Sequence, residues 1–131
     1  MTELARGTFA VKLLPMPFEG QPDSSKLGRM SMAKTFAGDL LATSQGQMLS
    51  AMAELKGSAG YVAIERVEGA LNGRAGSFVL QHTGSMNRGV PSLSVTVVPD
   101  SGTGDLSGLA GDFKIINADG QHSYQFAYAL P

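Results

Sequence analysis

The chain contains no cysteine and no tryptophan, and only 16% of its 131 residues are charged. Without cysteine it can form neither a disulfide framework nor a thiolate nucleophile. Its 10 basic and 11 acidic residues give a formal net charge of -1. That balance argues against a surface evolved to bind nucleic acid or anionic membranes.

Long hydrophobic runs are missing as well. The longest spans about five residues, whereas a helix that crosses a bilayer needs roughly 20. The opening stretch MTELARGTF has an acidic residue where a signal peptide has basic ones, and no apolar core follows it. We therefore expect a cytoplasmic protein, with residues 1–131 forming a single domain, and neither nucleic acid nor membrane as a partner.

Alternation of apolar and polar residues dominates the chain and predicts strands rather than helices. The first candidate strand covers residues 8–13. Leu14 to Ser25 is rich in proline and predicts a long surface loop. Further short strands are expected near residues 29–36, 40–52, 61–71, 76–84, 92–98, 111–117 and 122–130, with a short helix at SAMAEL (50–55) as an alternative. This meander predicts an all-β fold, a single antiparallel eight-stranded barrel, with a sandwich left open.

Two dipeptides set the register of this barrel. Asn72-Gly73 and Asp119-Gly120 each lie between alternating segments, the strongest local signal for a two-residue hairpin. Lys34 shares a face with apolar neighbours and is also expected to point inward. The chemically interesting residues that this pattern turns toward the interior are Lys34, Tyr61, Glu65, His82, His122, Tyr124 and Tyr128.

The glycine-rich stretch SGTGDLSGLAGDFKI, residues 101–115, raises the question of a phosphate-binding loop. A Walker loop needs a lysine directly after its last glycine, whereas Asp105 follows Gly104. A dinucleotide loop has a tighter glycine spacing and leads into a helix, whereas a strand pattern follows here. The stretch therefore predicts a barrel corner, where glycine lets the backbone bend.

Three segments, GSAGYVAIERV, LNGRAGSFVLQH and VVPDSGTGDLSGLAG, resemble the bacterial family known as domain of unknown function 3224. This resemblance runs over nearly the whole chain. The glycine segment and AGYVAIERV are also similar to allene oxide cyclases and, more loosely, to dirigent proteins. The resemblance implies an allene-oxide-cyclase-like barrel, lipocalin-like in shape. It does not carry over cyclase activity, because Tyr61 stands where the cyclases have a lumen cysteine and their early-strand glutamate has no counterpart.

An eight-stranded barrel has an interior that is either filled by side chains or holds one small ligand. We expect binding of a small, partly apolar ligand in this interior, the lumen. The ligand-binding candidates are Lys34, Tyr61, Glu65, His82, His122 and Tyr124.

Two alternatives to ligand binding stay open. One is an acid-base enzyme of isomerase or cyclase type, with Glu65 and His82 as catalytic candidates and burial raising the pKa of Glu65. The other is a packed structural barrel whose inner polar groups only satisfy one another and which acts through oligomer surfaces.

No cofactor and no metal are expected, because His82, His122 and Glu65 lack a ligand spacing typical of metal sites. The seven methionines are interpreted as core filling rather than as a cofactor site. By the same register, the outer face carries Val62, Ile64 and Val79. Since exposed apolar patches mark interfaces, we expect a homo-oligomer.

Overall fold

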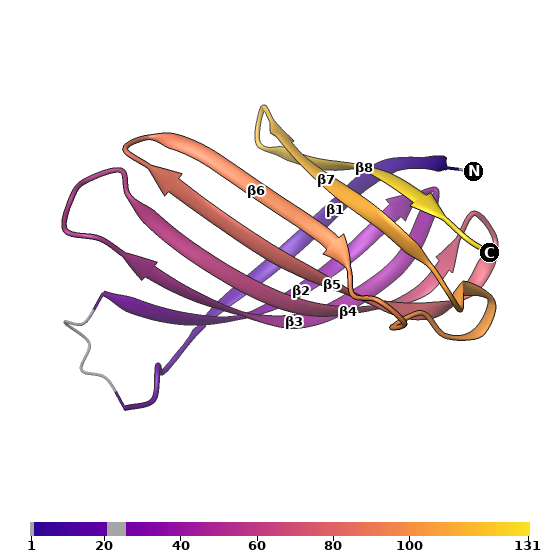
Figure 1. The fold of residues 1–131 in the computed structure, drawn as a ribbon, viewed down its shortest axis with the longest axis horizontal. Coiled ribbons are helices and arrows are strands. Elements are labelled where there is room, and N and C mark those ends of the chain that lie inside the picture. Colours follow the sequence, from indigo (N-terminus) through magenta and orange to yellow (C-terminus); the bar gives the residue numbers. More distant parts are fainter. Residues whose placement is uncertain (1, 21–25) are drawn as a thin grey trace.

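The computed structural model describes residues 2–20 and 26–131. Within these residues the chain forms eight strands and one short 3-10 helix (Figure 1). They are, in chain order, β1 (Glu3–Met16), β2 (Leu27–Gly38), β3 (Leu40–Met52), β4 (Ala59–Leu71), β5 (Arg74–Asn87), β6 (Val90–Val97), η2 (Gly104–Leu106), β7 (Ala110–Ala118) and β8 (Gln121–Ala129). Each strand pairs antiparallel with the next, and β8 pairs with β1. The predicted antiparallel barrel is confirmed. In this part of the chain no helix is long and apolar enough to span a membrane.

Several strands are longer than predicted, and β1 shows this most clearly. It begins at Glu3 and continues through Pro15 to Met16, so the predicted loop from Leu14 was wrong at its start. Beyond Phe9, β1 pairs with β2 and no longer with β8, and a proline is tolerated on such a one-sided strand. Of the rest of that predicted loop, residues 21–25 lie outside the described residues. The segment 40–52 is strand throughout, so the alternative of a helix at its end was wrong.

The two hairpin dipeptides have the conformation that their sequence predicts. All four residues at 72–73 and 119–120 have positive φ angles, between 47° and 83°, as a type I′ turn requires. The resulting register places Ala63 opposite His82 and Phe113 opposite Phe126. The predicted inner and outer faces of these hairpins are therefore confirmed.

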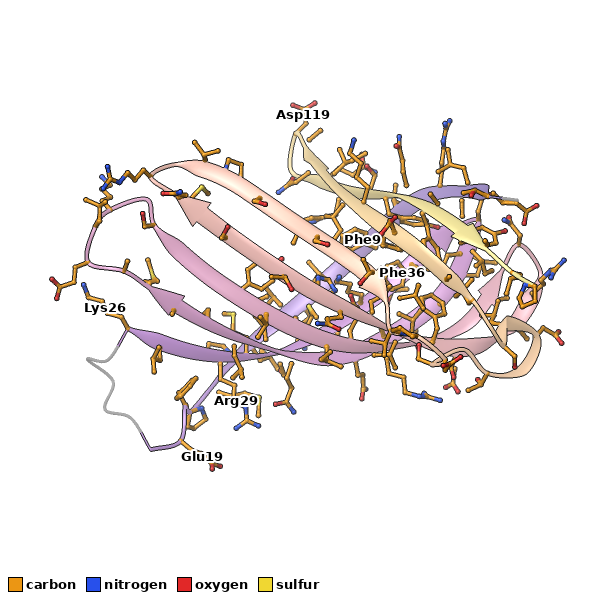
Figure 2. All side chains as sticks on the ribbon, in the orientation of Figure 1. Phe9, Glu19, Lys26, Arg29, Phe36 and Asp119 are labelled. Carbon is orange, nitrogen blue, oxygen red and sulfur yellow. The ribbon has the colours of Figure 1, made fainter. Side chains whose placement is uncertain are left out.

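One half of the barrel interior is filled by aromatic and aliphatic side chains, and we call it the packed half. Its rings lie 5.2 to 5.9 Å apart between centroids. The aromatic side chains concerned are Phe36, Phe78, Phe113, Tyr124, Phe126 and Tyr128. Figure 2 shows Phe9 and Phe36 inside the barrel, whereas Arg29 and Glu19 point outward. Ring burial of this kind is the main stabilising term of the fold.

The glycine-rich stretch closes the end of the packed half. Leu106 and Leu109 enter the core from it, and the Thr103 N–H donates to the Ser77 carbonyl at 2.8 Å. A Cβ at Gly102 would clash with the carbonyl oxygen of Leu106, so this tight path needs glycine. The stretch leads into β7, as the prediction of a barrel corner requires. It also buries Ser77, which the register alone placed on the open outer wall.

The other half of the barrel has an incomplete wall. β8 pairs with β1 over residues 3–9, whereas β1 continues to Met16. β6 begins at Val90 but meets β7 only near its end, at Thr96 and Asp112, among the described residues. Figure 1 shows β2 to β6 extending well past the hairpin of β7 and β8. The inner face of β1 to β6 beyond that hairpin is called the open half.

Candidate functional site

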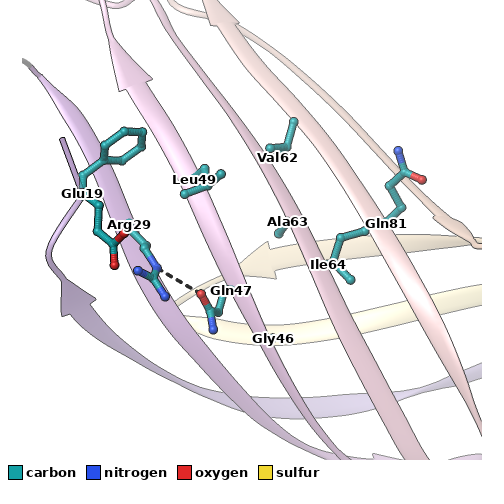
Figure 3. A pocket seen from close by; sticks show the side chains of 10 residues that line it. Glu19, Arg29, Gly46, Gln47, Leu49, Val62, Ala63, Ile64 and Gln81 are labelled. Carbon is teal, nitrogen blue, oxygen red and sulfur yellow. Dashed lines mark hydrogen bonds between the residues drawn. The ribbon is translucent and has the colours of Figure 1, made fainter. Parts of the chain in front are cut away.

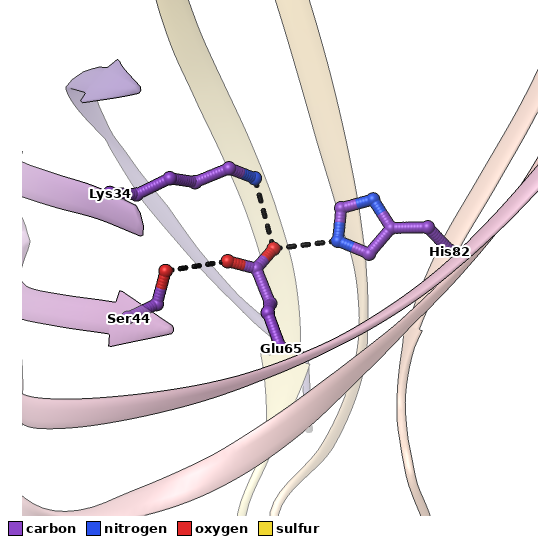
Figure 4. Close-up of polar contacts among 4 residues, drawn as sticks. All are labelled: Lys34, Ser44, Glu65 and His82. Carbon is purple, nitrogen blue, oxygen red and sulfur yellow. Dashed lines mark hydrogen bonds and ion pairs between the residues drawn. The ribbon is translucent and has the colours of Figure 1, made fainter. Parts of the chain in front are cut away.

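A polar cluster lies on the inner face of four neighbouring strands: Lys34 from β2, Ser44 from β3, Glu65 from β4 and His82 from β5 (Figure 4). Lys34 Nζ donates to Glu65 Oε1 at 2.9 Å, and Ser44 Oγ donates to Glu65 Oε2 at 2.6 Å. His82 Nε2 lies 2.6 Å from the same Oε1 atom. Glu65 is therefore the centre of the cluster, and its predicted contact with His82 is present.

The strand register explains why these side chains meet. Glu65 lies directly opposite Gly46 on β3, and a Cβ at Gly46 would lie only 2.7 Å from the Glu65 Cα. Because Gly46 has no side chain, the inner space opposite Glu65 is left open, and side chains from neighbouring positions can occupy it. Lys34 and Ser44, which are cross-strand partners, fill that space.

The cluster is buried, which makes its pairing obligatory. Glu65 is 0% exposed, His82 2% and Lys34 5%. A buried charge without a partner costs several kcal/mol, so each member depends on the others. The Lys34 ammonium also lies 5.0 Å from the centre of the Phe9 ring, within range of a cation–π interaction.

Burial by itself raises the pKa of Glu65, but its partners outweigh burial. The hydrogen bond from His82, the charge of Lys34 and the hydrogen bond from Ser44 lower the pKa to about 2. The expectation of a raised pKa was therefore wrong, because it counted the burial and not the partners. Glu65 is a carboxylate at neutral pH and acts there as a hydrogen-bond acceptor.

The ionised carboxylate decides which ring nitrogen of His82 holds the proton. Nε2 must donate to Glu65, so the neutral imidazole leaves Nδ1 as an acceptor. Nδ1 makes no hydrogen bond with Lys34, Ser44 or Glu65 (Figure 4). In residues 2–20 and 26–131, every fully buried polar side-chain atom has a partner. Nδ1 therefore retains a small exposed surface, although His82 as a whole is only 2% exposed.

Tyr61 lies beside the cluster on the same strand as Glu65. Its ring packs against Gly84 on β5, where any side chain would collide with it. Burial and the nearby charge of Glu65 raise the pKa of Tyr61, so its hydroxyl stays protonated. Tyr61 is only half-buried, and its ring lies over Gly84, two positions along the inner face of β5 from His82.

The other two candidates lie apart from the cluster. His122 comes from β8 and contacts Phe9, with ring centroids 5.2 Å apart, whereas Lys34 comes from β2, on the other edge of β1. Tyr124 belongs to the packed half, and burial raises its pKa. Its hydroxyl accepts from the Leu40 N–H at 2.9 Å and donates to the Ala37 carbonyl at 2.8 Å.

Ser44 is the member of the cluster that sequence reasoning missed. Extending the register of the 72–73 hairpin across β3 would have placed it on the face of Glu65, diagonal to that residue. Among the described residues, no three His, Asp or Glu side chains gather as metal ligands would. The contacts of the cluster itself offer hydrogen bonding and, through the His82 ring, proton exchange.

The inner face of the open half keeps solvent contact. Met52, Leu93 and Met86 point inward by register, yet they are 66%, 46% and 39% exposed. Inner-facing side chains of β1 to β6 with partial or full exposure include Val11, Leu13, Met30, Met48, Ser50, Met52, Tyr61, Met86 and Leu93. The prediction that methionine fills the core is confirmed for Met32, which is buried, and is wrong for Met52 and Met86.

A large hollow lies away from the cluster, on the outer face of the barrel (Figure 3). It is a groove of about 1030 Å³ between the segment at Phe18 and the outward side chains of β3 and β4. Leu49, Val62 and Ile64 form its apolar wall, and Arg29 Nε donates to Gln47 Oε1 at its rim. The sheet separates this groove from Glu65, so the two are treated as different surfaces.

Comparison with known proteins identifies the family. The family model described as a protein of unknown function (DUF3224) matches residues 5–128. A DUF3224-family protein of unknown function from Shewanella oneidensis MR-1 has a crystal structure with a TM-score of 0.94 to this chain. The two are 50% identical, and the match covers 100% of this chain and 98% of that one. No curated protein matches. The likeness to allene oxide cyclases stays a prediction, whereas the chain itself belongs to the DUF3224 family.

Proposed function

We propose that this protein binds a small, partly apolar molecule in the open half of its lumen. The observation that supports this function is the solvent exposure of inward side chains such as Met86 and Leu93. In a filled barrel, inward side chains are buried, as Phe78 and Leu80 are in the packed half. An exposed apolar inner face next to a few polar groups is the usual composition of a ligand site.

The inner face of the open half is rich in methionine. Of the six described methionines, Met16 points outward and the other five point inward on β2 to β5. The inward ones are Met30, Met32, Met48, Met52 and Met86. Their flexible, polarisable side chains adapt to the shape of a ligand better than branched ones. The wall therefore favours an apolar ligand body without demanding one fixed outline.

The edges of the open half favour a small molecule over a peptide strand. β1 carries Lys12 and Pro15 beyond its pairing with β8, and β6 carries Pro91. Lysine and proline on a free edge oppose the addition of another strand. The opening between these edges therefore stays available as an entrance.

A second candidate function is acid-base catalysis in the same lumen. The 2.6 Å contact between His82 and the ionised Glu65 would stabilise an imidazolium, so His82 can act as a base with Glu65 as its positioning residue. Nitrobenzisoxazole tests this, because a base removes its ring C–H proton while the N–O bond breaks to give a coloured phenolate. A rate enhancement that the His82→Gln variant loses supports catalysis, and equal rates with and without the protein contradict it.

Binding is tested by titration with the fluorescent probe N-phenyl-alpha-naphthylamine. We expect saturable binding of one probe per chain, and a loss of about tenfold in affinity for Met48→Glu, which adds a charge to the inner face. Leu49→Glu is the matched control, because the next residue of β3 points to the outer groove. A larger loss in Leu49→Glu than in Met48→Glu, or no binding by the folded wild type, would overturn the proposed function.

A further inference from the structure

The hydrogen-bonding capacity of the cluster narrows the kind of ligand that the open half can take. Both carboxylate oxygens of Glu65 are occupied, one by Ser44 and one shared by Lys34 and His82. Lys34 is buried and directed at Glu65 and at the face of the Phe9 ring. The two full charges of the cluster are therefore buried and paired with each other.

His82 and Tyr61 supply the polar atoms that remain. With Nε2 donating to Glu65, Nδ1 is the acceptor atom of a neutral His82 ring, and it has no donor from the cluster. The protonated hydroxyl of Tyr61 can donate and accept. The two residues occupy diagonal positions on β4 and β5, since Ala63 is opposite His82 and Tyr61 precedes Ala63 by two positions. Side chains in this relation can reach the same small group.

We propose, resting on the proposed binding function, that the lumen selects an uncharged ligand with a hydroxyl group on an apolar body. The ligand O–H donates to His82 Nδ1, and its oxygen accepts from the Tyr61 hydroxyl. A phenol or an alcohol satisfies both groups at once. The apolar body lies against Met30, Met48 and Met86.

The same geometry disfavours ligands whose polar group is a carboxylate or a ketone. A carboxylate would bring its charge close to Glu65 and its lone pairs to His82 Nδ1, while Lys34 stays directed at Glu65. Burying a charge without a counter-charge is costly. A ketone has no proton for Nδ1 and leaves that acceptor unpaired, which is also unfavourable.

The test is displacement of the bound naphthylamine probe at about pH 7.5, where imidazoles are ordinarily neutral. The competitors are naphthalene, alpha-naphthol and alpha-naphthoate, which share one ring system and differ in their polar end. We expect naphthol to bind about tenfold more tightly than naphthalene, the size expected of one well-placed hydrogen bond, and naphthoate to bind most weakly. In His82→Phe the preference for naphthol should fall to about twofold or less, and in Tyr61→Phe it should fall partway.

His122→Phe is the matched control, because His122 also faces inward but comes from β8 and contacts Phe9 rather than a member of the cluster. It should keep the preference for naphthol. Equal affinities of naphthol and naphthalene, tightest binding of naphthoate, or loss of the preference in His122→Phe would overturn this inference alone. Failure of the naphthylamine probe to bind would overturn the proposed function as well.

Heteronuclear NMR of the wild type tests the tautomer without relying on a folded variant. The neutral ring of His82 should carry its proton on Nε2, and adding naphthol should shift the Nδ1 resonance. A neutral ring protonated on Nδ1, or an Nδ1 resonance that naphthol does not move, would contradict the inference.

Discussion

The packed and open halves of the barrel are built from the same strands, but the inward side chains are buried in one half and exposed to solvent in the other. On β5, Phe78 is 1% exposed, whereas Met86 on the same face of the same strand is 39% exposed. The cause is the length of the neighbouring strands, because β7 and β8 have 9 residues each, whereas β1 and β5 have 14. One alternating pattern thus yields a core where the ring of strands is complete and a solvated surface where it is not.

The polar cluster lies between these halves. Glu65 and His82 are as buried as the aromatic core, and Nδ1 of His82 has no hydrogen bond within the cluster. Because the cluster lies at this border, the packed half shields its charges from solvent, while its other side can contact a ligand in the open half. In this barrel the buried polar cluster is therefore located at the boundary between the packed half and the open half.

The largest effect should come from truncating the packed half. Phe126→Ala removes a fully buried ring and should lower the free energy of unfolding by about 4 kcal/mol, because it opens a cavity. Met86→Ala in the open half should cost less than about 1 kcal/mol, because its side chain already meets solvent. Urea denaturation measures both, and similar losses would mean that the halves do not differ in packing.

The next effect concerns the cluster. Glu65→Gln leaves Lys34 buried without a counter-charge and should destabilise the fold by about 3 kcal/mol. Glu68→Gln makes the same change on the same strand at an exposed pair with Arg66, and should change stability by less than about 0.5 kcal/mol. Urea denaturation at neutral pH that gives equal values for the two variants would contradict a structural role for the cluster.

The pH dependence of stability follows from Glu65. Its pKa is lowered in the folded protein to about 2 from the ordinary 4.5, so the unfolded chain takes up the proton first as the pH falls. The stabilisation is complete above about pH 4.5 and is lost as the pH falls toward about 2, on the order of 3 kcal/mol in all. Urea denaturation at several pH values in this window gives the free energy of unfolding as a function of pH. This free energy should fall less steeply with decreasing pH in Glu65→Gln than in Glu68→Gln. Equal pH dependence in the two variants would contradict the assignment to Glu65.

The smallest effect on stability is expected on the outer face. Val62 and Ile64 are about half exposed, and the charges near them, Arg66 and Glu68, are of both signs, so a second copy of the chain could lie against this face without net repulsion. We expect self-association in solution, and monomers from the double variant Val62→Lys, Ile64→Lys, with a stability change below about 1 kcal/mol. Light scattering checks both, and a monomeric wild type at micromolar concentration would contradict this prediction.

Strand alternation and hairpin turns were enough to predict the barrel fold and part of the candidate site. The hairpins at 72–73 and 119–120 each fix a register, and register alone places Glu65 next to His82. Lys34 could be placed on an inner face but not against Glu65, because their contact depends on how β2, β3 and β4 lie side by side. Ser44 was missed for the same reason.

The sequence by itself therefore determined which side chains face inward, because strand alternation and two-residue turns act over a few residues. Tertiary structure alone decided how far those side chains are buried and what they contact. The lowered pKa of Glu65 needed three partners from three other strands, and the strand at Pro15 needed an edge that β8 does not reach. The open half arises because β7 and β8 end early, and burial depends on that distant wall.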